Sequence, residues 1–275
     1  MRRSVMLALT VALGIEAGFI EVDAVHAQQG ADPRVADLVK AGKLRVGLGL
    51  GSEALAMKNP ATGEVKGPAL DLARALAARI GIEVQAVEYP RPGAIMEGVR
   101  TNAWDVTFFA IDPARAAEVD FSPPYMQGDL TYLVVAGSSI RSVADADQPG
   151  VRITAPRGDS VDLYLSRTLK RAELVRTDSF AACLELLRAG KADAFPASRG
   201  NLLVRAAQLP GSRVLEDRFA VISYGAVVPK GHPGRLAYVT EFIEEAKASG
   251  LVQQTIERAG LLGVQVAPPG NKTTQ

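Results

Sequence analysis

The sequence predicts an α/β fold built as two units, each a mainly parallel sheet flanked by helices. Apolar strand-like runs alternate with amphipathic helical stretches over residues 44–111, and consecutive parallel strands need crossover helices of this kind. The same alternation starts again over residues 151–216. Residues 130–137, between the two sets, are strand-like and lead from the first to the second, and residues 223–229, after the second set, read as the return strand. We therefore expect two strands that cross from one unit to the other.

In the first unit we expect strands at residues 44–50, 82–87 and 104–111, and helices at residues 68–80 and 93–100. Pro68 begins the longer helix and Gly81 ends it, an arrangement that helix termini favour. The apolar residues of this helix recur on one face, whereas Asp71, Arg74 and Arg79 lie away from it. That face is expected to pack on the sheet.

In the second unit we expect strands at residues 151–156, 173–177 and 192–197, and helices at residues 160–170, 179–189 and 200–208. Two further helices, at residues 234–249 and 251–259, are expected to finish the chain. The spacing Glu-x-x-Arg-x4-Asp occurs at residues 97–105 and again at residues 185–193, each time between a helix end and a strand. This repetition favours two related units.

The composition excludes several classes of protein. The 275-residue chain has a formal net charge of +1, whereas a nucleic-acid-binding protein would show a basic patch or a high pI. No uncharged apolar run reaches about 18 residues, so we expect no transmembrane helix.

Histidine and cysteine are scarce. Of the two His, His26 precedes an expected cleavage site, which leaves His232 alone. A histidine-based metal site or a Ser-His-Asp triad is therefore not expected, and we predict neither a metal nor a cofactor. The single cysteine, Cys183, lies in an apolar helical pattern and is expected to be a buried structural thiol.

The first 27 residues have the pattern of a secretory signal peptide. Arg2 and Arg3 precede an apolar run at residues 5–15, and the segment closes on the small residue Ala27. We place the cut after Ala27. The residue directly after the cut is Gln28 and not a cysteine, so we expect a mature protein without a lipid anchor, free in the periplasm.

One segment resembles a known family. Residues 111–125, IDPARAAEVDFSPPY, place Arg115 after an Asp-Pro start and end in a Pro-Pro-Tyr turn. The segment resembles the "T-x-x-R…(D)FS-x-PY" pattern of the family 3 periplasmic solute-binding proteins, the binding subunits of polar amino-acid ABC transporters. The helix at residues 66–81, the loop at residues 151–160 and the segment at residues 188–195 are similar to further motifs of that family. The likeness covers about residues 44–261.

The resemblance implies a type II periplasmic binding protein fold with two crossing hinge strands. Lobe 1 would comprise residues 31–131 plus 226–275, and lobe 2 residues 132–225. It also implies a non-enzymatic monomer that traps a small carboxylate-bearing solute between the lobes by hinge closure. Its partner would be an ABC transporter permease in the inner membrane.

The same resemblance implies which residues touch the ligand. Arg115 would clamp the carboxylate, since a guanidinium offers a fixed fork of donors; alternatively it forms a salt bridge with Asp112 or Asp120. Backbone amides at Gly158, Asp159 and Ser160, which begin the first helix of lobe 2, would hold the same carboxylate. Asp159 itself would act as an N-cap, or would face the cleft and receive an ammonium group.

Two departures from the family pattern affect the ligand's other end. The family usually carries an aromatic pair after the first strand, where this chain has Ser-Glu-Ala-Leu at residues 52–55. The family's ammonium-binding Asp corresponds to Ser198 here. Glu53, Asp112 or Asp159 could replace that acid.

Other ligands and functions stay open at this point. Arg157 and Arg199 could make the pocket more cationic and suit a dicarboxylate or another organic acid. A secreted enzyme similar to cyclohexadienyl dehydratases is the main alternative, with Arg115 as substrate anchor and Asp159 or Glu53 as general acid. A sensor domain is a third hypothesis, against which the expected lack of a transmembrane segment counts.

Overall fold

A computed structural model describes residues 32–270 of the chain. The predicted signal peptide, residues 1–27, lies outside the described residues. Most strands of the described part join one ten-stranded sheet with the order β4-β1-β5-β11-β6-β9-β7-β8, in which β10 and β12 pair with β6. Its strands are β1 (Lys43–Gly49), β4 (Glu83–Tyr89), β5 (Val106–Ala110), β6 (Val119–Val134), β7 (Arg152–Pro156), β8 (Glu173–Thr177), β9 (Ala194–Ser198), β10 (Arg213–Val214), β11 (Ala220–Pro229) and β12 (Val264–Val266).

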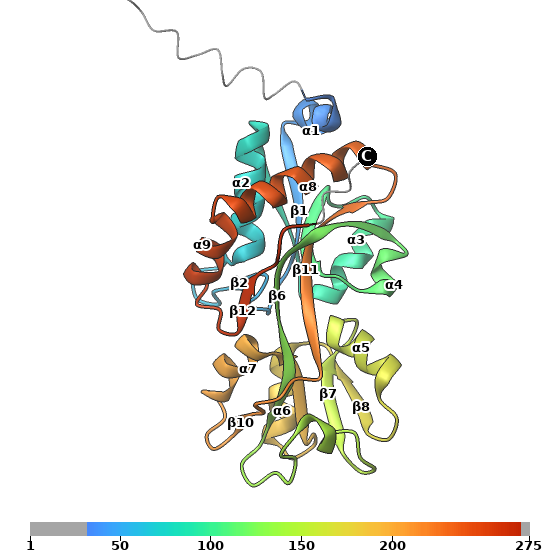
Figure 1. Cartoon of the computed structure of the whole chain (residues 1–275), viewed down its shortest axis with the longest axis vertical. Helices are drawn as coiled ribbons and strands as arrows, with labels where there is room; N and C mark the ends of the chain where they lie inside the picture. The colour runs from blue at the N-terminus through green and yellow to red at the C-terminus, as the bar shows by residue number, and fades with distance from the viewer. Residues whose placement is uncertain (1–31, 271–275) are drawn as a thin grey trace, which may run out of the picture.

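The strands at each end of this order form a parallel group. Strands β4 and β5 both run parallel to β1, and strands β8 and β9 both run parallel to β7. We call the first group with its helices lobe 1 and the second group with its helices lobe 2; they are the upper and lower parts of Figure 1. The expected pair of α/β units is therefore confirmed, and the exact lobe bounds given above stay a prediction.

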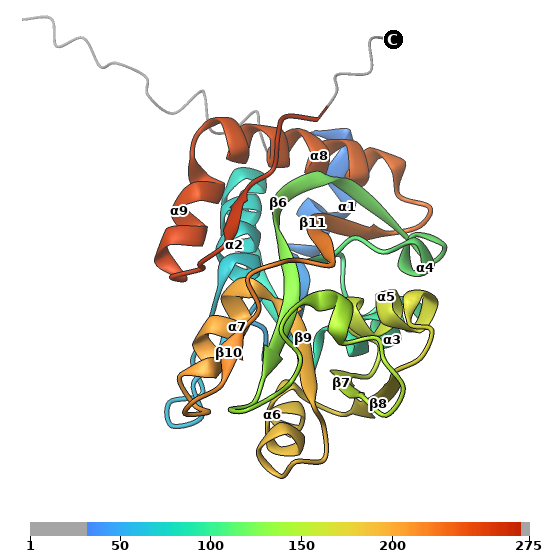
Figure 2. The same ribbon diagram turned by 60° about the horizontal axis from the view of Figure 1, so that its bottom comes forward.

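Helices cover both parts of the sheet. Lobe 1 carries α1 (Ala36–Ala41), α2 (Pro68–Ile80), α3 (Glu97–Arg100), α4 (Pro113–Ala116), α8 (Pro233–Ala248) and α9 (Leu251–Arg258). Lobe 2 carries α5 (Ser160–Thr168), α6 (Phe180–Arg188) and α7 (Arg199–Ala206). Figure 2 shows α8 lying across lobe 1, with α9 beside α2. Across residues 32–270, each helix falls short of the length and hydropathy that spanning a bilayer requires.

The ends of α2 follow from local chemistry, as predicted. Pro68 is its first residue, and Gly81 takes the left-handed conformation at φ 81°. The Gly81 amide donates to the carbonyls of Ala77 and Ala78 and so satisfies the last turn. By contrast, the expected helix at 93–100 is a 3-10 segment, Pro92–Met96, followed by the short α3.

Strands β6 and β11 are antiparallel neighbours that cross between the lobes, running lengthwise in Figure 1. β11 also pairs with β5 in lobe 1, and β6 with β9 in lobe 2. Our expectation of a turn at Pro-Pro-Tyr was wrong, because Pro123, Pro124 and Tyr125 lie inside β6. Prolines cannot donate to a ladder, and here they lie where the β6–β11 register shifts beside Gly225.

Each lobe contains the same Arg–Asp salt bridge, called here the joint. It links β1 to the residue before β5 in lobe 1, and β7 to the residue before β9 in lobe 2. In lobe 1 the Asp105 carboxylate accepts from the backbone amide of Arg45 at 2.9 Å and from its Nη2 at 2.6 Å. In lobe 2 the Asp193 carboxylate accepts from the amide of Arg152 at 2.8 Å and from its Nη2 at 2.9 Å. Both aspartates end the repeated Glu-x-x-Arg-x4-Asp spacing, which therefore marks equivalent positions.

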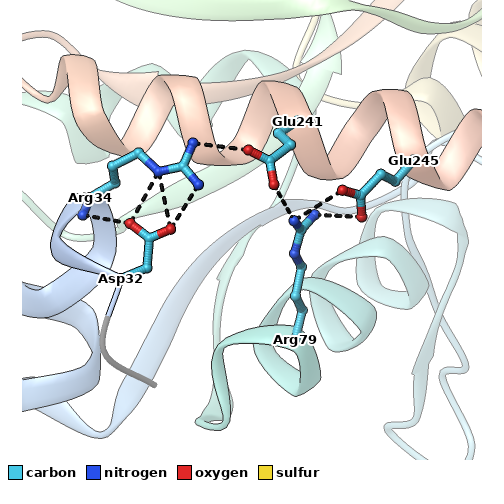
Figure 3. Close-up of polar contacts among 5 residues, drawn as sticks. All are labelled: Asp32, Arg34, Arg79, Glu241 and Glu245. Carbon is cyan, nitrogen blue, oxygen red and sulfur yellow. Dashed lines mark hydrogen bonds and ion pairs between the residues drawn. The ribbon is translucent and has the colours of Figure 1, made fainter. Parts of the chain in front are cut away.

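Ion pairs connect helix α8 both to α2 and to the segment around Arg34 (Figure 3). Arg34 bonds to Asp32 at 2.7 Å and to Glu241 at 3.0 Å. Arg79 contacts Glu241 as well and pairs with Glu245 at 2.9 Å. These partly exposed pairs share members, and a network of this kind stabilises more than isolated surface pairs do.

Candidate functional site

A cavity of about 20 Å³ lies between the two lobes. Its walls are formed by Ser52, Leu55, Pro92, Ala110, Arg115, Asp159, Ser160, Val161, Phe180, Ala197, Ser198, Asn201, Ile222 and Tyr224. In this form it has room for about one water molecule, so a larger solute would enter with the lobes further apart.

Every parallel strand of the sheet contributes to these walls through the segment after its carboxyl end. In lobe 1 the contributions are Ser52 after β1, Pro92 after β4 and Arg115 after β5. In lobe 2 they are Asp159 after β7, Phe180 after β8 and Asn201 after β9. Ligand sites of open α/β sheets lie at these strand ends, and here the two sets of ends face one cavity.

Arg115 is a buried cation with unused donors. Its residue is 3 % exposed, and the guanidinium lies over the ring of Phe109 at 4.6 Å. Nη1 donates to the Ala110 carbonyl at 2.9 Å, and Nη2 donates to the Gly158 carbonyl of lobe 2 at 2.8 Å. Nε has no partner among the described residues. Burial lowers the pKa of Arg115, but a guanidinium stays charged in proteins.

The salt bridges that the sequence offered for Arg115 do not form in this structure. Asp112 caps α4 by accepting from the Ala114 amide at 2.8 Å, and its other oxygen pairs with Arg167 of lobe 2 at 2.8 Å. Asp120 pairs with Lys230 at 3.1 Å. The guanidinium of Arg115 is therefore held by carbonyls and keeps its full charge for the cavity.

Asp159 is both a helix cap and a wall of the cavity. Its Oδ1 accepts from the Val161 amide at 3.0 Å and from the Ser160 hydroxyl at 3.3 Å. The residue is only 7 % exposed, and burial raises its pKa, while the nearby charge of Arg115 acts in the opposite direction. The two roles predicted as alternatives are thus compatible, because one oxygen serves the cap.

Three buried polar side chains complete the cavity. The Ser198 hydroxyl and the Asn201 Oδ1 have no partner among the described residues, and both residues are at least nine-tenths buried. The Asn201 Nδ2 donates to the Ser52 hydroxyl of lobe 1 at 3.4 Å. Tyr224 is buried beside them, and this burial raises the pKa of its phenol. Unsatisfied buried polar atoms of this kind fit a site that awaits a ligand.

Glu53 and Asp112 do not line the cavity. Glu53 pairs with Arg205 of lobe 2 at 2.6 Å, just as Asp112 pairs with Arg167. Gly158 is also absent from the walls, but its carbonyl accepts from Arg115. Of the two arginines proposed for a more cationic pocket, Arg199 donates to the carbonyls of Leu215 and Glu216, each at 2.8 Å, and neither Arg199 nor Arg157 lines the cavity.

Sequence reasoning missed Phe180, Asn201 and Tyr224. Phe180 begins α6 after the capping residue Ser179 and was indistinguishable from a core residue of an amphipathic helix. Ser52 and Leu55, which stand where the family carries its aromatic pair, do line the cavity, and the aromatic residues on its wall are instead Phe180 of lobe 2 and Tyr224 of β11.

The described residues contain no cluster of three or more His, Cys, Asp or Glu that could bind a metal ion. Cys183 is buried, its sulfur lies 3.0 Å from the Thr177 hydroxyl, and burial raises its pKa to about 11. A thiol in this state is a packing group rather than a nucleophile.

Comparison with known proteins identifies the family. The family described as bacterial extracellular solute-binding proteins, family 3, matches residues 44–260 of the chain. The chain belongs to this family. The resemblance seen in the sequence and the two-lobed type II fold are thereby confirmed.

The chain is similar to several characterised family members. A glutamine-binding protein of Geobacillus stearothermophilus is 29 % identical over 191 residues, which are 68 % of this chain and 72 % of that protein. An ABC transporter binding component of Wolinella succinogenes, solved with lysine, is 27 % identical with a TM-score of 0.71, covering 79 % of this chain and 95 % of that one. An ancestral amino acid-binding protein described as a precursor of cyclohexadienyl dehydratase is 25 % identical with a TM-score of 0.72, covering 82 % and 97 %.

Proposed function

We propose that this family member is the periplasmic solute-binding subunit of an ABC importer and captures an α-amino acid between its lobes by hinge closure. The observation that carries the proposal is the presence of one buried cation, Arg115, and one buried carboxylate, Asp159, on the walls of the same cavity. A zwitterion presents the complementary pair of charges. The names of its relatives, which include glutamine-binding and other amino-acid-binding proteins, support this ligand class.

Each group of the ligand has a partner in this arrangement. The Arg115 guanidinium has five N–H donors, of which the two carbonyl contacts use two, so its Nε edge is free for a carboxylate. Asp159 would accept from the ammonium group, with the Asn201 Oδ1 and the Ser198 hydroxyl as further acceptors. Asp159 would thus take the role of the family's ammonium-binding Asp, whose position is Ser198 here.

The charges favour an amino acid over a dicarboxylate. Among residues 32–270, Arg115 is the one cationic side chain on the cavity wall, and Asp159 offsets its charge. A second carboxylate of the ligand would meet Asp159 or an apolar wall, and burying an unpaired charge is costly.

A secreted enzyme similar to cyclohexadienyl dehydratases is the second candidate. Two observations favour it: the raised pKa of Asp159, which suits a general acid, and the likeness to a precursor of such an enzyme. Turnover of prephenate or arogenate by the purified protein would support this candidate, and the absence of any turnover would exclude it.

The binding proposal is tested with matched ligands that differ only in the amino group, such as L-alanine against propionate and L-glutamine against its deaminated analogue. Isothermal titration should give binding heat with at least one α-amino acid and none with the analogue that lacks its amino group. Arg115→Met, which keeps volume and removes the donors, should weaken binding by about a hundredfold or more, because a charged hydrogen-bonded contact is lost. Equal affinity for both members of each pair would refute the amino-acid assignment.

A further inference from the structure

A second hollow, of about 230 Å³ and open to the surface, lies beside the cavity. The two share one lining residue, Phe180. Glu53 and Arg205 line the second hollow but not the cavity. Phe180, Glu53 and Arg205, called here the partition, therefore stand between the cavity and an adjoining empty space.

The partition is tied together by buried charges. The Arg205 Nη1 bonds to the Glu53 Oε1 at 2.6 Å, and its Nη2 donates to the Gly51 carbonyl at 2.9 Å. The same guanidinium lies over the Phe180 ring, 5.1 Å from its centroid. The side chains of Arg205 and Glu53 are 8 % and 14 % exposed, so this ion pair is largely screened from water.

The partition is built from both lobes. Phe180 on α6 and Arg205 on α7 belong to lobe 2, whereas Gly51 and Glu53 follow β1 in lobe 1. One turn before Arg205 on the same helix, Asn201 makes a further contact with lobe 1 through Ser52. The wall is therefore complete only when the lobes have met, and a bound ligand would have to fit inside it.

The walls set the direction of the ligand's side chain. With the ligand's carboxylate at Arg115 and its ammonium at Asp159, the remaining wall is mainly apolar, formed by Leu55, Phe180 and Ile222. A long side chain reaching past Phe180 would have to displace the ring and separate Arg205 from Glu53. Separating them leaves two charges buried without partners, which strongly opposes binding.

We propose that the partition of Phe180, Arg205 and Glu53 limits the length of the ligand, so that the site takes α-amino acids with short side chains and excludes long ones. This inference rests on the proposed function and deepens it. It sets the chain apart from relatives whose names specify glutamine or whose structure holds lysine.

The experiment uses the unbranched series glycine, alanine, 2-aminobutyrate, norvaline and norleucine, in which the side chain grows by one carbon at each step. Isothermal titration of the mature protein should give an affinity that falls at least about tenfold between alanine and norleucine, since a surplus methylene in a closed pocket is rejected about tenfold or more. The double variant Glu53→Ala/Arg205→Ala joins the two spaces and should restore norleucine binding by a similar factor.

A matched variant separates the effect of the partition's volume from the effect of its charges. Glu53→Gln/Arg205→Met keeps most of the volume but removes the ion pair, so displacing the Phe180 ring no longer leaves charges unpaired and the length limit should be relaxed. Phe180→Ala leaves the ion pair in place and removes the shared ring, and it should also admit norleucine if the first variant does not fold.

The outcomes distinguish this inference from the function on which it rests. Binding of norleucine by the wild type as tightly as alanine, or an unchanged length limit in a folded opening variant, would overturn the partition alone. Absence of binding by every α-amino acid would overturn the proposed function and the partition together.

Discussion

The two lobes carry the same Arg–Asp joint in different surroundings. In lobe 1 the Asp105 side chain is 7 % exposed and also faces Arg235 of α8 at 3.6 Å. In lobe 2 the Asp193 side chain is 35 % exposed and pairs with Arg152 alone. The difference arises because α8 covers lobe 1. One sequence pattern therefore gives a buried ionic network in one lobe and a surface pair in the other.

The lobes also contribute differently to the cavity. Lobe 1 supplies Arg115, the one cation that the described part of the chain places on the wall, and its guanidinium is fixed by backbone carbonyls. Lobe 2 supplies the acid Asp159 and the polar side chains Ser198 and Asn201. Lobe 1 is thus the more heavily covered unit, and lobe 2 brings most of the polar side chains on the cavity wall.

The largest expected effect comes from breaking the joint in each lobe. Asp105→Ala removes the bonds to Arg45 and one of the two carboxylates beside the buried Arg235, which keeps its pair with Asp37, and should lower the free energy of unfolding by about 2–3 kcal/mol. Asp193→Ala should cost only about 1 kcal/mol, since its pair is largely solvated. Urea unfolding of the two ligand-free variants measures both losses of stability. Equal losses would show that burial beneath α8 does not strengthen the joint of lobe 1.

A smaller effect is expected at Asp159. Asp159→Asn can still cap α5, but it loses the charge that would hold the ammonium, so amino-acid affinity should fall about tenfold or more. In the ligand-free protein the raised pKa of Asp159 means that its stabilising contribution is present below about pH 4 and is lost as the pH rises through the raised value.

Although Asp159→Asn should weaken ligand binding, it should raise the stability of the ligand-free protein at higher pH. Because asparagine does not titrate, the ligand-free variant should become more stable than the wild type as the pH rises from about 4 to 8. Thermal unfolding of both proteins across this range measures the difference. A constant difference would mean that Asp159 ionises as it does in an unfolded chain.

The smallest effect is expected at the pair between Asp112 of lobe 1 and Arg167 of lobe 2. The Arg167 side chain is 45 % exposed, so Arg167→Gln should weaken the closed form by about 1 kcal/mol or less. Small-angle scattering of the ligand-free variant should show a larger radius of gyration, and ligand affinity should fall no more than about fivefold.

A matched control exists within lobe 2. Arg176 pairs with Asp162 at the same 2.8 Å separation, with side chains that are 34 % and 6 % exposed. Arg176→Gln should therefore cost a similar amount of stability without changing the separation of the lobes. If both variants open the molecule equally, the Asp112–Arg167 pair has no special role in closure.

The sequence was most informative where structure depends on neighbours along the chain. The limits of α2 follow from Pro68 and Gly81, which act within one helical turn. The position of Arg115 follows from the Asp-Pro start of α4. The turn expected at Pro123 and Pro124 was wrong, because their conformation depends on pairing with β11, about a hundred residues later.

The candidate site was predictable only in part for the same reason. Arg115, Asp159, Ser160 and Ser198 were named from motifs and all line the cavity. Glu53 could not be assigned, because its partner Arg205 lies 152 residues away and comes close only when the lobes meet. Phe180 faces the cavity for a similar reason, since the walls combine segments from six strand ends.

The lobes also touch through main chain. A Cβ atom on Gly93 of lobe 1 would lie 2.7 Å from the Gly158 carbonyl group of lobe 2, so glycine is required at this contact. The angle of closure is therefore limited by two backbones rather than by the side chains of the cavity. Substitutions on the walls can change ligand preference during evolution while the outline of the closed molecule, the surface that a transporter would meet, stays the same.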